Sequence, residues 1–193
     1  MKDEKIQKTE TTIEWYEHTV SVEEYLEKCV DVPVFLEYCK ECHNYRQVWS
    51  CPPFSFSPME YWKKYRTFHI IGMKILLPSS LTQKKYTEEE RKEVLDAALL
   101  PKKEALNKKL LDMEKEREGS VSLSGGSCQI CDGGCTRPQG KPCRFPETMR
   151  YSIEALGGNV GLTVTKYLHQ ELQWMEEGKL PDYFMLIGGL LLP

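Results

Sequence analysis

The stretch that organises this chain is CQICDGGCTRPQGKPC at residues 128–143, which has the spacing Cys-x2-Cys-x3-Cys-x7-Cys. Cysteine thiolates are the usual ligands of [4Fe-4S] clusters, and one compact cluster takes four of them. Three closely spaced cysteines can wrap such a cluster, and a fourth from a loop of glycine and proline can close it. The spacing therefore predicts an iron–sulfur cluster on four ligands, Cys128, Cys131, Cys135 and Cys143.

Zinc is the main alternative for this loop. The familiar zinc pattern places two Cys-x2-Cys pairs roughly 15 to 20 residues apart, so that four sulfurs surround one ion, and the present spacing departs from it. Disulfides or unliganded thiols are a third possibility. The N-terminal MKDEKIQK is charged and no apolar run follows it, unlike a secretory signal, so we expect a cytoplasmic protein. Disulfides are rare in that compartment.

Several residues beside the cysteines suit a cofactor. Gly125 and Gly126 lack a Cβ atom, so their backbone N–H groups can approach cluster sulfur closely. A [4Fe-4S] core with four thiolates carries a net charge of about −2, which Arg137, Lys141 and Arg144 would offset. We therefore predict that Gly125, Gly126 and Arg144 contact the cofactor. The solubility of an exposed loop explains the basic residues equally well.

A second cysteine set, Cys39, Cys42 and Cys51, has the spacing Cys-x2-Cys-x8-Cys and no adjacent fourth sulfur. The fourth ligand is Cys29, His43 or an exogenous group on an open iron site. Cys29 can equally be a small buried hydrophobe at the end of a helix. Because Cys51 is followed by proline, as in bacterial ferredoxin runs whose last cysteine serves the other cluster, cross-ligation is a further option.

The chain has 193 residues, 40% of them apolar, and a net charge of −3, which predicts one globular domain over residues 1–193 with a disordered segment at 1–10. Alternating or continuous apolar patterns predict strands, and capping signals predict helices. The fold class is therefore α+β, with a small mixed sheet, packed helices and two neighbouring cysteine-rich loops at the surface. The expected strands are 12–20, 66–77, 120–124 and 182–192, and the expected helices are 21–29, 87–100, 101–119, 146–156 and 162–177.

Three function classes find no support in the sequence. Lysine and arginine are not in excess, so nucleic-acid binding is not indicated. The longest apolar run, 183–192, is far shorter than the roughly 20 residues that span a bilayer. The chain also lacks the phosphate-binding and nucleophile motifs of common enzyme folds.

Both cysteine sets lie in longer motifs. These are CHNY at 42–45, WSCPP at 49–53, GGSCQIC at 125–131, Cys135, KPCRFP at 141–146, Met149, Arg150, Ser152, Glu154, Ala155 and Gly157. The motifs resemble a family of cysteine-rich bacterial and archaeal proteins of unknown function, catalogued as predicted metal-binding proteins. The resemblance covers about residues 36–165 and implies metal binding without a reaction. By position, it implies seven ligands and leaves Cys29 outside the pattern.

Three functions are compatible with these patterns. The leading one is an iron–sulfur protein with one or two [4Fe-4S] clusters that transfers electrons to or from a partner enzyme. The second is an interaction module in which zinc supplies folding energy. The third is an enzyme whose three-cysteine site leaves an iron open to substrate. The sequence leaves the partner, substrate, reduction potential and oligomeric state open.

Overall fold

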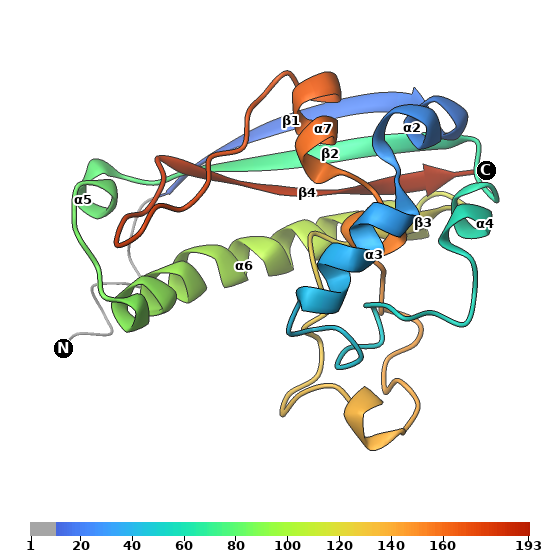
Figure 1. Ribbon diagram of the computed structural model, residues 1–193. Helices are drawn as coiled ribbons and strands as arrows, with labels where there is room; N and C mark the ends of the chain where they lie inside the picture. Colours follow the sequence, from blue (N-terminus) through green and yellow to red (C-terminus); the bar gives the residue numbers. More distant parts are fainter. Residues whose placement is uncertain (1–10) are drawn as a thin grey trace.

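A computed structural model describes residues 11–193 and shows an α+β domain built on one four-stranded sheet (Figure 1). The α+β class is therefore confirmed, whereas the disorder expected for 1–10 lies outside the described residues. All four expected strands are present. In the sheet order they are β1 (Thr12–Ser21), β2 (Thr67–Leu76), β4 (Tyr183–Leu192) and β3 (Val121–Leu123).

The sheet is antiparallel, where a mixed sheet was expected. Each of the three ladders pairs antiparallel strands, and the one parallel pair in the described residues is the isolated bridge between Ser124 and Ser152. Strands β2 and β3 both run antiparallel to β4, so they run in the same direction with β4 between them. This insertion of the last strand makes every ladder antiparallel.

Both faces of the sheet are covered, as the apolar central strand β2 predicts. Helices α2 (Val22–Cys29) and α7 (Val160–Tyr167) lie on one face, and α6 (Glu88–Lys115) lies along the other (Figure 1). Phe68 and Ile70 join the first core, whereas Ile71 joins the second with Leu106 and Leu110 of α6.

The Gly188–Gly189 pair in β4 allows a close approach and forms no bulge. The ladder with β2 continues in register through both glycines. A Cβ atom on Gly188 would lie 2.6 Å from the carbonyl oxygen of Leu123 and 2.7 Å from Cδ1 of Leu110. Glycine here therefore lets β3 and α6 pack directly against β4.

Helix α6 is continuous over 28 residues, where two helices divided at Pro101 were expected. A capping box begins the helix, because Thr87 Oγ1 accepts from Glu90 N at 3.2 Å and the Glu90 carboxylate accepts from Thr87 N at 3.0 Å. Pro101 lies on the exposed side of the helix. Proline removes one hydrogen bond of the helix, and packing of the apolar face of α6 on the sheet outweighs this loss.

Helix α3 (Val32–Glu41) is not among the expected helices. Proline disfavours a helix interior, but Pro33 lies in the first turn, where a backbone N–H has no partner within the helix. Asp31 caps the helix by accepting from Val34 N at 3.1 Å. Two short helices, α4 (Pro58–Trp62) and α5 (Ser79–Thr82), complete the chain before α6.

Two helices expected after residues 128–143, the main cysteine loop, are wrong in extent. Residues 146–156 form only the 3-10 turn η2 (Glu154–Leu156), because long-range contacts hold the segment: Ser124 N donates to Tyr151 O at 2.9 Å. Helix α7 ends at Tyr167, and His169 has a φ of +52°, a conformation that stops a helix. In the described part of the chain, we find no helix with the length and apolarity that a bilayer crossing requires.

Candidate metal centre

The two cysteine loops lie against each other, as expected (Figure 1). Ser50 Oγ accepts a hydrogen bond from Cys128 N at 3.0 Å, and Trp49 Nε1 donates to Lys141 O at 3.1 Å. Asn44 Nδ2 donates to Ser127 Oγ at 3.3 Å. These contacts join residues separated by about 80 to 90 positions in the sequence.

Arg137 is the strongest link between the loops. Its guanidinium donates to the carbonyl oxygens of Val48, at 2.7 Å, and Pro53, at 2.6 Å, and also to that of Cys51. It also lies over the ring of Trp49, with 5.1 Å from Cζ to the ring centroid. The sequence suggested Arg137 as a counter-charge for a cluster. In the structure it holds the backbone of residues 48–53, the first loop, which carries Cys51. The 3-10 turn η1 (Arg137–Gln139) carries it.

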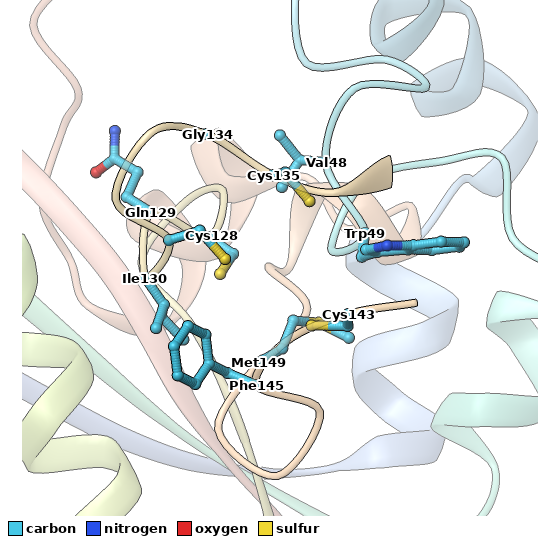
Figure 2. Close-up of a pocket in the computed structure, with 11 residues that line it drawn as sticks. Val48, Trp49, Cys128, Gln129, Ile130, Gly134, Cys135, Cys143, Phe145 and Met149 are labelled. Carbon is cyan, nitrogen blue, oxygen red and sulfur yellow. The ribbon is translucent and has the colours of Figure 1, made fainter. Parts of the chain in front are cut away.

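All four cysteines of the main loop border one cavity of about 210 Å³. This is more than ten times the roughly 10–15 Å³ that one water molecule needs in the same measure. Figure 2 shows the sulfur atoms of Cys128, Cys135 and Cys143 facing the space between their chain segments. Trp49, Phe145 and Met149 are among the side chains that form its walls, which are mainly apolar.

The thiols of the main loop surround a space instead of meeting at a point. Within residues 11–193, no three Cys, His, Asp or Glu side chains lie close enough together to hold a single ion. Burial raises the pKa of Cys128, and Cys131, Cys143 and Cys135 raise it further, although a backbone hydrogen bond from Ile130 opposes them. A cation that stabilises these thiolates must therefore displace protons when it binds.

The other predicted cofactor contacts do not border this cavity. Gly125 N donates to Asn107 Oδ1 at 2.8 Å. Gly126 has a φ of +76° and packs against Lys103. The guanidinium of Arg144 donates to the carbonyl oxygens of Asp132 and Gly134, both at 3.2 Å, so it braces the backbone of the cysteine loop.

Cys39, Cys42 and Cys51 form a second neighbourhood at the end of α3. Burial, followed by the nearby Cys51, Cys42 and Glu154, raises the pKa of Cys39 to about 11. The pKa of Cys51 is raised by burial, then by Cys42 and, more weakly, by Cys128. Cys51 therefore lies near a cysteine of its own set, Cys42, and near Cys128 of the main loop.

The two candidate fourth ligands from the chain, Cys29 and His43, lie in different environments. Cys29 is 2% exposed in the core between the sheet and α7. His43 is exposed beside Cys42. Cys29 thus takes the role of a buried hydrophobe, the alternative that the sequence left open, because α2 packs its last turn into the core.

Two charged residues that the sequence did not single out lie between the cysteine sets. Lys103 Nζ donates to Ser127 O at 2.7 Å. Burial lowers the pKa of Lys103, whereas Cys128, Glu154 and Cys51 raise it. Burial also raises the pKa of Glu154. Lys103 is one of many lysines on α6, and no local pattern distinguishes it; Glu154 was noted only within the family resemblance.

A second cavity, of about 220 Å³, adjoins the second cysteine set. Cys39 and Glu154 border it together with apolar side chains, among them the stacked pair Phe54 and Phe56, whose ring centroids lie 4.8 Å apart. Aromatic residues thus cover both cavities. Aromatic side chains therefore line the cavity of the main loop and the cavity beside Cys39, whereas Cys42 is exposed.

Comparison with known proteins gives one match. A family model described as "Predicted metal-binding protein" matches residues 27–192, which contain all eight cysteines. No curated protein and no solved structure matches the chain significantly. Because the match covers most of the chain and both cysteine loops, the chain belongs to this family of predicted metal-binding proteins of unknown function (DUF2284).

Proposed function

We propose that this protein is an iron–sulfur protein that transfers electrons to or from a partner protein. Cys128, Cys131, Cys135 and Cys143 hold one [4Fe-4S] cluster, and Cys39, Cys42 and Cys51 help to hold a second. The observation that carries the proposal is the shared cavity, which all four thiols of the main loop border. A bound [4Fe-4S] cluster takes up one electron and releases it to an acceptor without net chemistry on the protein.

The size of the cavity favours a polynuclear centre over zinc. In a structural zinc site, four sulfurs lie about 2.3 Å from a single ion and enclose no further space. Here the four cysteines border about 210 Å³. Trp49, Phe145 and Met149 would keep water from the sulfurs, and such shielding sets the potential of a cluster and protects it from oxygen.

The contact between the loops supports relay between two clusters. Cys51 follows Ser50, whose hydroxyl accepts from the backbone N–H of Cys128, so a ligand of each site is joined through the single residue Ser50. Lys103 adds a positive charge near Cys51 and Cys128. Ile130 and Phe145, 42% and 43% exposed at the rim of the main cavity, would face a redox partner. The cytoplasm would keep the thiols reduced for this role.

Anaerobic purification tests the proposal. We expect a brown protein with broad absorbance that bleaches on reduction, with about four iron and four sulfide per cluster. Cys143→Ser should lose the cluster of the main loop, whereas Cys29→Ser, the matched control in the core, should keep all iron. A colourless wild-type protein that binds zinc instead would contradict the proposal and favour the zinc-stabilised module.

A further inference from the structure

A buried carboxylate oxygen without a partner lies beside the second cysteine set. Among the side chains described, Oε2 of Glu154 is the one fully covered nitrogen or oxygen atom that lacks a hydrogen bond. Part of the residue is accessible, but the carboxyl group itself is buried, and this burial raises the pKa of Glu154. Buried polar atoms in proteins are nearly always paired, so this oxygen is positioned for a partner from outside the chain.

The fold holds Glu154 in this place through a close contact between η2 and α3. A Cβ atom on Gly157 would lie 2.7 Å from Cα of Val32, so only glycine permits the approach. The Gly157 carbonyl also accepts from Asp31 N, the N-cap of α3, at 2.9 Å. As a result, Glu154 and Cys39 border the same cavity, and the carboxyl acts electrostatically on the Cys39 thiol.

An ion pair with Lys103 does not account for the free oxygen. Lys103 Nζ donates to Ser127 O at 2.7 Å, and the ion pairs found among residues 11–193 do not include one with Glu154. Lys103 acts on Glu154 only over a longer distance. The Glu154 carboxyl therefore has a nearby cationic group but no direct partner.

We infer that the Glu154 carboxylate supplies the oxygen ligand that completes the Cys39, Cys42 and Cys51 site. The inference rests on the proposed function, in which this site holds iron. Cys29 is in the core, so a fourth sulfur is not at hand. Carboxylate oxygen is an accepted ligand for iron, and an iron atom bound to Oε2 would give that oxygen the partner it lacks. One iron of this cluster then carries an oxygen ligand, whereas the main-loop cluster is bound by sulfur alone.

Iron content of anaerobically purified variants tests this ligand. Glu154→Gln keeps the shape of the side chain but is a poor ligand, so iron should fall to about half of the wild-type content of about eight atoms per chain. Glu154→Cys should restore the second cluster with four sulfur ligands. Glu37→Gln, an exposed position on the same helix as Cys39, is the matched control and should keep all iron.

Mössbauer spectra of the wild-type protein, loaded with the active iron isotope, give a readout that needs no variant. One iron site should have the larger isomer shift that an oxygen ligand produces, and this signal should vanish in Glu154→Cys. Circular dichroism checks that Glu154→Gln is folded, and if it is not, the wild-type spectrum decides. Full iron content in folded Glu154→Gln, or a spectrum with sulfur-ligated sites alone, would overturn the ligand assignment and leave the iron–sulfur function intact. A wild-type protein without iron would overturn both.

Discussion

The side chain of Ser50 binds the backbone of Cys128: its hydroxyl oxygen accepts from the Cys128 N–H at 3.0 Å. Ser50 is only 1% exposed, so water cannot replace it. The loop that carries Cys51 thus orients Cys128, the first cysteine of the main loop, and neither cysteine set is positioned by its own sequence alone.

Ser50→Ala should weaken the contact between the loops. The buried N–H of Cys128 would lose its acceptor, which typically costs about 1–3 kcal/mol of unfolding free energy. Urea unfolding of the metal-free protein measures this loss. Ser55→Ala, an exposed serine of the same loop, should change the stability by less than about 0.5 kcal/mol. Equal stability of the two variants would contradict the role of Ser50.

Arg137→Lys should destabilise the protein although the charge is kept. A lysine ammonium cannot reproduce the planar fork that binds the carbonyl oxygens of Val48, Cys51 and Pro53. We expect a loss of about 2–3 kcal/mol in thermal or urea unfolding, as for hydrogen bonds to charged groups. Arg144→Lys, which affects only two contacts within the main loop, serves as the comparison and should cost less.

Lys103→Met should lower the reduction potential of the protein. The ammonium lies near Cys51 and Cys128, where positive charge favours the more negative, reduced state of a cluster. At an effective dielectric constant of about 20, removing one charge about 10 Å away costs the reduced state on the order of 1–2 kcal/mol. Redox titration followed by absorbance measures the shift. Lys92→Met, exposed on the same helix, should leave the potential unchanged.

Acid should destabilise the protein through the pair of Glu114 and Arg150. Burial alone would raise the pKa of Glu114, but hydrogen bonds from Arg150 and Ser122 hold it below its ordinary value of 4.5. A lowered pKa in the folded state gives stability that is complete above the unfolded pKa and is lost as the pH falls through the folded pKa. Unfolding free energy should therefore decrease below about pH 4.5.

Glu114→Gln should remove part of this acid dependence and lower the stability at neutral pH. The change leaves the partly buried Arg150 without its carboxylate, which is 2.8 Å from Nε. Glu116→Gln near the end of the same helix is the control. A wild-type pH profile as flat as that of Glu114→Gln between pH 3 and 6 would show that the pair contributes nothing.

Local patterns in the sequence were sufficient for the strands and for the grouping of the cysteines. Apolar residues on both faces of 66–77 predict a central strand, and β2 has that place because such a strand loses the most water-exposed surface when it is covered on both sides. The spacing of the main loop likewise predicted that its four cysteines act together, and they border one cavity.

Local signals failed where distant contacts outweigh them. Pro146 and Gly157 are good helix boundaries, yet the segment between them forms only turns and η2, because Tyr151 O pairs with Ser124 and Arg150 pairs with Glu114. Pro101 predicted a break that packing of α6 on the sheet prevents. In both cases, contacts over many residues contribute more free energy than a helix boundary does.

The amino-acid pattern thus specified which segments become strands and that Cys128, Cys131, Cys135 and Cys143 lie around one cavity, since both follow from the spacing of neighbouring residues. Packing in three dimensions alone placed Arg137 against the first loop, withdrew Cys29 into the core and set Glu154 beside Cys39. Each of these contacts joins groups far apart in the chain. Their free energy exists only once the sheet and helices have formed, so no short stretch of sequence carries a sign of it.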